Sequence, residues 1–392
     1  MLIIKNGKIS TMVGVSHDNG YIIADEGKII EIGDDINSAK IQVKSDAITI
    51  DAQGGYVLPG FIDAHCHVGL FEDSVGFEGE DGNEMTDPVT PHLRAIDGVY
   101  HADRAFAEAR ENGVTTVVTG PGSANVIGGQ FAAIKTWGRR IEEMILKDPV
   151  GMKIAFGENP KTVYYEKRQS PMTRMATAAI LRESLMKAKE YKEMLEKYDS
   201  DPEENDKPEY DMKLEALVKV LKKEIPLKAH AHRADDILTA IRIAKEFEVE
   251  ITLDHCTEGH LIKDILAEEK IPVIIGPSLT DRSKIELRNL TLKTPGILAD
   301  AGLRVAIMTD HPETPIQYLW LCAAMAVREG MKEEDALKAI TINAALNTGI
   351  ADRVGSLEIG KDADIVVFDG HPFEFKTRVA ATVINGNVVY KR

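Results

Sequence analysis

Short apolar runs alternate with helical patterns through the middle of the chain. Amphipathic segments such as 235–248 and 259–270 separate runs of the strand type, which read VTTVVTG, GMKIAFG, IPLKAHAH, VEITLDHC, IPVIIGPS and LRVAIMTD. Continuous apolar strands that alternate with amphipathic helices are typical of a parallel sheet covered by helices. The run FIDAHCH adds a further strand. So many strands favour a closed (β/α)8 TIM barrel over an open doubly wound sheet.

The two ends of the chain have a different pattern. Residues 1–58 and 346–392 contain short β-type runs broken by turn pairs such as Asn6-Gly7, and the second of these parts includes the stretch SLEIGKDADIVVFDG. Each end alone has too few strands to bury an apolar face. We therefore expect both ends to meet in one small β-sandwich domain, with the barrel occupying residues 59–345.

Residues 166–226 break the alternation of strands and helices. Two helical patterns flank the acidic linker DSDPEENDKPEY, which predicts a helical insert between two strands of the barrel. A surface helical hairpin is the simplest interpretation of this insert. A substrate lid and a subunit contact are the alternatives.

Composition narrows the class of function. The 392 residues are 44% hydrophobic and 28% charged, as in a folded, soluble protein. The net charge of −16 repels nucleic-acid phosphates and anionic membrane surfaces, so neither is an expected partner. The three cysteines are widely spaced, which favours a reducing compartment and a cytoplasmic location. The stretch MLIIKNGKIS has no long apolar core of the signal-peptide kind, and no apolar run reaches the roughly 18 residues that a membrane helix needs, so we expect neither a signal peptide nor a membrane helix.

The stretch LPGFIDAHCHVGL places His65 and His67 at the end of an apolar run. Residues i and i+2 of a strand point to the same side, so both imidazoles can face one point while Cys66 faces away. By itself the pair is weak support for a metal site, because two hydrogen-bonded structural histidines would give the same pattern.

Other apolar runs also end in polar residues that precede a loop, namely His230, His232, His255 and Asp310. In a barrel, the carboxyl ends of the strands carry the functional residues. Imidazole and carboxylate groups are the ligands that zinc and similar divalent metals favour. Convergence of these groups with the first histidine pair predicts a metal site at one mouth of the barrel.

These motifs resemble the amidohydrolase superfamily over essentially the whole chain, and most of all its imidazolonepropionase-related branch. The family pattern PGxIDxHxH matches the first barrel strand, and the SLEIGKDADIVVFDG pattern matches the C-terminal part. The resemblance implies a metal-dependent hydrolase with a small β-sandwich beside its barrel. The implied metal ligands are His65, His67, His230, His255 and Asp310.

The resemblance also implies catalytic roles. Asp310 matches the aspartate that binds metal and takes the proton from the attacking water. His232 lies on the same face one step nearer the loop than His230, so we expect it to contact a metal-binding residue or the substrate instead of the metal itself. We count it with Asp310 and Glu158 among the candidate catalytic residues.

Lys153, in the stretch GMKIAFGENPK, occupies the place of a lysine that two-metal members of the family modify with carbon dioxide. The resulting carbamate bridges both ions. An unmodified lysine would add a buried positive charge beside the metals, which is costly, so the carbamate is favoured. Glu158 is the alternative bridge, and a one-metal site is the third possibility. Zinc is the expected metal, with iron, manganese and nickel as alternatives.

Arg233 stands three residues after His230, where the one-metal deaminases and true imidazolonepropionases of the family carry a glutamate. This difference argues against nucleobase deamination and against imidazolonepropionase activity. Arg233 is a candidate substrate contact instead, together with Asn125 and Gln130 in the expected mouth loop TGPGSANVIGGQ, and His311.

Taken together, the motifs predict a metal-dependent amidohydrolase that acts on a small molecule. The expected bond is a C–N amide bond of a cyclic amide, an N-acyl amino acid or a dipeptide. A lactonase, esterase or phosphotriesterase with the same site is one alternative, and a non-catalytic scaffold is another. The insert and the resemblance favour a homo-oligomer.

Overall fold

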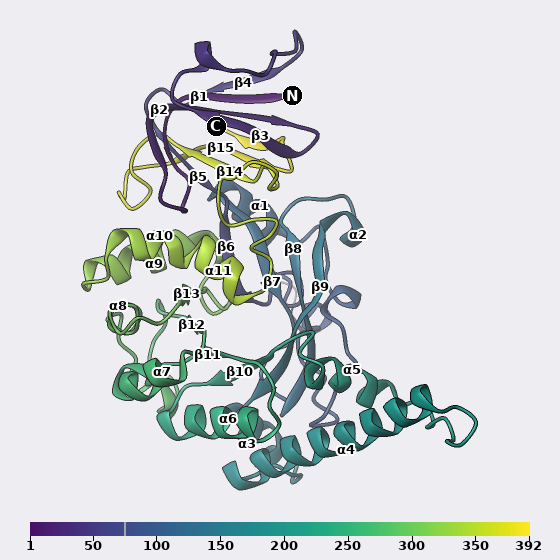
Figure 1. Cartoon of the computed structure of the whole chain (residues 1–392). Helices are drawn as coiled ribbons and strands as arrows, with labels where there is room; N and C mark the ends of the chain where they lie inside the picture. The colour runs from purple at the N-terminus through teal and green to yellow at the C-terminus, as the bar shows by residue number, and fades with distance from the viewer. Residues whose placement is uncertain (74–75) are drawn as a thin grey trace.

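The computed structural model describes residues 1–73 and 76–392, which form two eight-stranded sheets (Figure 1). One sheet is built from the middle of the chain and is wrapped by helices. The other contains strands from both ends of the chain, and it lies at the top of Figure 1.

The sheet of the middle region is a nearly closed barrel. Its strands neighbour one another in sequence order: β6 (Phe61–Cys66), β7 (Val114–Thr119), β8 (Ile127–Lys135), β9 (Ile145–Ala155), β10 (Leu227–Ala231), β11 (Ile251–His255), β12 (Val273–Ile275) and β13 (Val305–Ile307). The first and last strands meet just beyond β13, where the backbone amide of Asp310 donates a hydrogen bond to the carbonyl oxygen of His65 at 3.3 Å. The barrel expected from the alternating pattern is therefore found.

Strand β8 departs from the ideal (β/α)8 arrangement. It pairs antiparallel with both β7 and β9, whereas the other neighbouring strands pair in parallel. Residues 127–130, which we expected in a mouth loop, belong to this strand. Two adjacent glycines hide it in the sequence, and the structure explains one of them. A Cβ atom on Gly129, whose φ is +133°, would lie 2.6 Å from the carbonyl oxygen of Leu93.

Helices cover the outside of the barrel. Those that lie outside the insert are α1 (Arg104–Glu111), α2 (Ile141–Met144), α3 (Glu158–Glu166), α6 (Ala234–Glu246), α7 (Lys263–Glu269), α8 (Thr294–Asp300), α9 (Leu319–Arg328), α10 (Glu333–Ala339) and α11 (Ile342–Asn347). In α6, the buried residues Ile237, Ile241 and Ala244 recur at helical spacing. No helix of the described part of the chain is both long and apolar enough to cross a membrane.

The segment 166–226 contains α4 (Arg174–Ser200) and α5 (Met212–Leu221), which pack against each other along the lower edge of Figure 1. A hydrogen bond from the Tyr191 hydroxyl to Glu215 Oε1, at 2.7 Å, joins the two helices. The two helical patterns that the sequence predicts here are therefore present.

The second sheet joins the two ends of the chain, as the sequence predicts. Its strands are β1 (Leu2–Ser10), β2 (Ser16–Asp25), β3 (Lys28–Gly33), β4 (Ile48–Asp51), β5 (Tyr56–Pro59), β14 (Ile365–Phe368), β15 (Val379–Ile384) and β16 (Asn387–Lys391). Strand β5 makes the junction, since it pairs with β1 on one side and with β14 on the other. All eight strands belong to one sheet, so a separate β-sandwich is not confirmed.

Candidate metal centre

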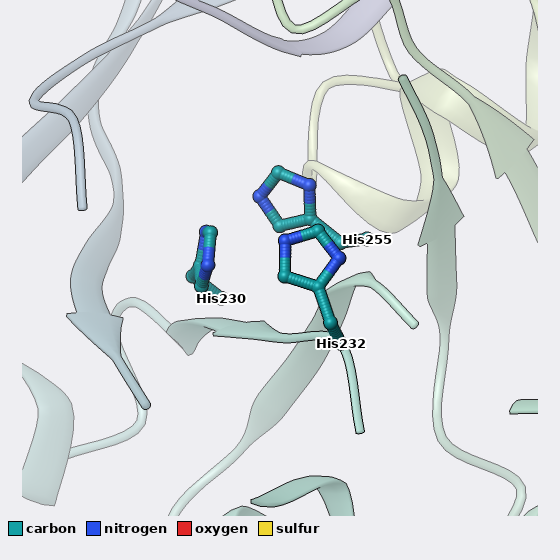
Figure 2. Close-up of side chains that lie close together, drawn as sticks. All are labelled: His230, His232 and His255. Atoms are coloured by element: carbon teal, nitrogen blue, oxygen red, sulfur yellow. The ribbon is translucent and has the colours of Figure 1, made fainter. Parts of the chain in front are cut away.

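Two groups of potential metal donors lie at the carboxyl ends of the barrel strands. The first consists of His65, His67 and Asp310, and the second consists of His230, His232 and His255. Within each group, one donor atom per residue lies within 4.8 Å of the others, and all six residues are buried. Figure 2 shows the rings of the second group turned toward one another. The structure thus brings together side chains that are far apart in the sequence.

Hydrogen bonds orient the imidazoles of the first group. His65 donates from Nδ1 to Asp254 Oδ2 at 2.6 Å, and His67 donates from Nδ1 to the carbonyl oxygen of Gly120 at 2.7 Å. The Nε2 atoms therefore carry the free lone pairs. They face Asp310, at 3.6 Å and 3.2 Å from its Oδ1 atom for His65 and His67 respectively.

The second group is arranged in the same way. Its ring centroids lie 4.1 to 4.7 Å apart. His255 donates from Nδ1 to the carbonyl oxygen of Gly276 at 2.9 Å, and Nδ1 of His232 lies 2.7 Å from the Thr257 hydroxyl. Neither nitrogen of His230 nor Nε2 of His255 has a hydrogen-bond partner among the described residues. Buried polar atoms of this kind normally have a partner, so the group fits a bound cation.

Backbone conformation helps to aim two of these side chains. His255 and Asp310 have φ values of 71° and 56°, in the left-handed region that residues other than glycine rarely adopt. Each residue lies at or just beyond the end of its strand, where the chain turns over the barrel mouth. Such conformations are found where a site requires a particular side-chain direction.

The charge states suit metal binding. Burial lowers the pKa values of His65, His230 and His255 well below the usual range, and it lowers the pKa of His232 to about 4. These imidazoles are therefore neutral near pH 7, with lone pairs free to bind a metal. Burial would raise the pKa of Asp310, but the neighbouring His255, His67 and Lys153 outweigh it and lower this pKa to about 2.

The two candidate bridging residues lie in different places. Lys153 is fully buried on β9, with Nζ 3.1 Å from Nε2 of His65, and burial lowers its pKa to about 8. Glu158 begins α3 and lines the mouth cavity, but it belongs to neither donor group. Lys153 is therefore the nearer of the two to the first donor group.

Glu286 is a buried carboxylate of the site that we did not predict. Its Oε1 atom lies 3.7 Å from Nε2 of His232 and 3.9 Å from Nε2 of His230. It comes from a short 3-10 helix, Ile285–Leu287, in the loop after β12. The polar stretch DRSKIELRN around it gives no periodic signal. Asp254 was also missed, although a charged residue inside the apolar run VEITLDH could have drawn attention to it.

A cavity of about 460 Å³ opens at this mouth of the barrel, a size that suits a small-molecule ligand. Its lining includes His67, His230, His232, His255, Asp310, Glu158 and Lys284. A larger cavity of about 600 Å³ lies beside the amino-terminal ends of β10, β11 and β12, and none of the donor groups lines it. The smaller cavity is therefore the candidate substrate site.

Two predicted substrate contacts, Asn125 and Gln130, hold loops together. The amide nitrogen of Asn125 donates to the carbonyl oxygen of Glu84 at 2.6 Å, and that of Gln130 donates to the carbonyl oxygen of Pro91 at 3.1 Å. Neither residue is among those that line the mouth cavity. Their contact with substrate stays a prediction.

The other two predicted contacts flank the cavity without lining it. Arg233 precedes α6 and makes two hydrogen bonds to Asp235, each of 3.0 Å. His311 is buried beside Asp310, and its Nδ1 accepts a hydrogen bond from the backbone amide of Ile316 at 3.2 Å. Contact of either residue with substrate also stays a prediction.

An α/β barrel with buried imidazole and carboxylate groups at the carboxyl ends of its strands defines the class of protein. The sequence model of the Amidohydrolase family matches residues 56–389, so the chain belongs to this family. The family and the names of the relatives described below support a hydrolase.

Relatives cover most of the chain. A solved structure described as an amidohydrolase from Thermotoga maritima MSB8 is 45% identical, covers 100% of both chains and has a TM-score of 0.95. The protein named Amidohydrolase tasK, from Hapsidospora irregularis, is 29% identical over 90% of this chain, which spans 38% of the length of that relative. An imidazolonepropionase from Caldanaerobacter subterraneus subsp. tengcongensis is 26% identical over 91% of this chain and 86% of its own length.

Proposed function

We propose that the protein is a metal-dependent amidohydrolase that cleaves a C–N amide bond of a small molecule. The observation that carries this proposal is the convergence of two buried donor groups at one cavity in the mouth of the barrel. The similarity to proteins named amidohydrolase and imidazolonepropionase supports amide chemistry. The substrate classes we propose are cyclic amides, N-acyl amino acids and dipeptides.

The donor atoms fit divalent metal ions. Oδ1 of Asp310 and Nε2 of His230 and His255 are buried without a hydrogen-bond partner among the described residues, which a cation would remedy. One ion would be held by His65, His67 and Asp310, and a second by His230 and His255. Zinc is our first choice, with iron, manganese and nickel as alternatives. Bound here, the metal would polarise a carbonyl group and activate water.

Asp310 would act as the proton carrier. Its carboxylate is anionic near pH 7, lies at the mouth of the barrel and lines the cavity. It would accept the proton of the attacking water and pass it to the departing nitrogen, as a positioned acid–base group does. The donor side chains are buried, and electrostatic interactions are stronger in such surroundings than in bulk water.

Lys153 would carry the carbamate. Burial lowers the pKa of its amine to about 8, which leaves a neutral fraction near pH 7 that can react with carbon dioxide. In this reaction Nζ of the neutral amine forms a bond to the carbon of carbon dioxide, one C=O π bond breaks, and the nitrogen releases one proton, so that a neutral group becomes an anion. An anion beside the donor groups offsets the charge of the metals. Glu158 is the alternative anionic group.

The proposed reaction class can be tested with a substrate panel. We expect purified protein to hydrolyse at least one N-acyl amino acid, hydantoin or dipeptide, to lose this activity on chelation and to regain it with zinc. The variant Asp310→Asn should lose about 100- to 10,000-fold in rate. Activity confined to lactones, esters or phosphotriesters would contradict the amidohydrolase proposal and favour the alternative chemistry with the same site.

A further inference from the structure

Two buried residues at the mouth, His232 and Glu286, have no ligand role in the function proposed above. His232 continues the inward-facing positions of β10, two residues beyond His230. Nδ1 of His232 lies 2.7 Å from the Thr257 hydroxyl, and in the tautomer in which Nδ1 donates to this hydroxyl, Nε2 has a free lone pair. Figure 2 shows its ring directed toward the rings of His230 and His255. The three imidazoles therefore present donor atoms to one point.

Glu286 lacks a compensating cation. Its Oε2 atom accepts a hydrogen bond from the backbone amide of Glu158 at 2.9 Å, and its Oε1 atom has no hydrogen-bond partner among the described residues. Within residues 1–73 and 76–392, no lysine or arginine forms an ion pair with Glu286. The basic groups near its carboxylate are the imidazoles of His230 and His232, whose Nε2 atoms lie 3.9 and 3.7 Å from Oε1. A buried carboxylate without a cation is costly, so a positive charge is expected nearby.

The backbone makes room for this carboxylate. Gly157, at the start of α3, has a φ of +82°, and a Cβ atom there would lie 2.6 Å from Oε2 of Glu286. The glycine therefore permits an acidic side chain from the loop after β12 to reach the histidines of β10.

We propose that His230, His232 and His255 form a three-imidazole site for a divalent metal ion, and that the carboxylate of Glu286 lies beside that ion and offsets its charge. Oε1 of Glu286 lies 3.7 and 3.9 Å from Nε2 of His232 and His230. Glu286 is not among the residues whose donor atoms all lie within 4.8 Å of one another, so we place its carboxylate beside the ion rather than among its ligands. This inference rests on the proposed metal dependence and adds His232 to the ligands that the family resemblance implies.

Metal content tests the role of His232. The full-length protein is loaded with zinc, desalted and analysed by mass spectrometry, and the dissociation constant of each ion is measured with a competing chelator. We expect two ions in the unmodified chain. In His232→Asn, one ion should stay tightly bound while the second binds at least about 100-fold more weakly. His260→Asn is the matched control, because His260 lies at the same mouth outside both donor groups.

X-ray absorption provides a readout independent of activity. The inference predicts five imidazoles over two zinc ions in the unmodified chain and four in His232→Asn. If His232→Asn binds both ions with unchanged affinity, the inference is wrong but the proposed function still stands. The same holds if the unmodified chain binds a single ion. Failure of the unmodified chain to bind any ion would overturn the proposed function as well.

The charge of Glu286 is tested by Glu286→Gln, which keeps the shape of the side chain. We expect two ions still to bind, the second about tenfold more weakly. Glu258→Gln is the control, because Glu258 is also buried but accepts hydrogen bonds from the Ala234 amide and Asn289. If Glu286→Gln and Glu258→Gln bound the second zinc ion with equal affinity, the placement of Glu286 beside that ion would be contradicted.

Discussion

Asp254 fixes the orientation of a proposed metal ligand. It accepts a hydrogen bond from Nδ1 of His65 at 2.6 Å and lies 3.1 Å from Nζ of the buried Lys228. Asp254→Asn would allow the other tautomer of His65, in which Nε2 is protonated and unable to bind a metal. We expect metal affinity to fall about 10- to 100-fold. Competition with a chelator measures this change, and unchanged affinity would show that Asp254 does not set the tautomer. Asp236→Asn is the control, since this carboxylate pairs with Arg174 instead.

Lys153 gives a second prediction at the level of a single residue. Lys153→Ala removes the amine and leaves space beside His65. If the amine carries a carbamate, activity should fall about 10- to 100-fold and be partly restored by acetate or propionate, whose carboxylates replace the lost anion. A variant with full activity would remove Lys153 from the site. A loss that no small acid restores would contradict the carbamate.

Among single residues, the sequence could predict those site residues that end an apolar run of the strand type. His65, His230 and Asp310 end apolar runs, and the structure places all of them at one mouth of the barrel. Glu286 lies in an irregular polar loop, and its distance to the histidines depends on how that loop folds over the mouth. A residue of this kind has no local pattern that distinguishes it from a solvated charge.

Among the elements, helix α4 allows a matched test of packing. It buries Leu185 completely, whereas the neighbouring Met186 is 48% exposed. Leu185→Ala leaves a cavity in the core and should lower the free energy of unfolding by about 2 to 5 kcal/mol. Met186→Ala should change it by less than about 0.5 kcal/mol. Urea unfolding followed by circular dichroism measures both variants, and equal effects would contradict the packing of the insert.

Strand β8 shows why one element could not be predicted. The other barrel strands are continuous apolar runs, and the alternation with helices makes each of them visible. Strand β8 contains Gly128 and Gly129 and runs antiparallel between β7 and β9, with one short helix, α2, before β9. Its place in the sheet follows from pairing with strands on both sides, which a local pattern does not encode.

At the scale of the whole molecule, a buried ion cluster joins the two sheets. Lys135 of β8 forms ion pairs with Asp364, which precedes β14, and with Asp362 at 3.1 Å. Asp362 also accepts two hydrogen bonds from Arg353, at 2.8 and 2.9 Å, and one from Lys28 at 2.6 Å. Asp362→Asn would leave these cations without their shared anion. We expect it to lower the free energy of unfolding by about 3 kcal/mol, and Asp352→Asn, at an exposed site, to have little effect.

The same cluster predicts a pH dependence. Burial would raise the pKa of Asp362, but the hydrogen bond from Arg353 and the charges of Lys135 and Lys28 outweigh it and lower the pKa from 3.8 to about 2. A carboxyl group whose pKa is lower in the folded state stabilises the fold above its unfolded pKa, and this stabilisation is lost as the pH falls through the folded pKa. The stability difference between the unmodified chain and Asp362→Asn should therefore shrink between about pH 4 and pH 2. A difference that stays constant over this range would contradict the assignment.

The large-scale arrangement was partly predictable for a similar reason. The short β-type runs at both chain ends expose apolar faces, and their union in one sheet was expected from the need to bury these faces. The size and lining of the mouth cavity depend on loops of irregular sequence, and these could not be derived from local patterns.

The most direct test of the account is a crystal structure of the zinc-loaded protein with anomalous data measured at the zinc absorption edge. We predict two anomalous peaks, one between His65, His67 and Asp310 and one between His230, His232 and His255. Diffraction maps with no peak at either group, from protein crystallised near pH 7 with zinc present, would contradict the metal centre and the hydrolase chemistry proposed for it.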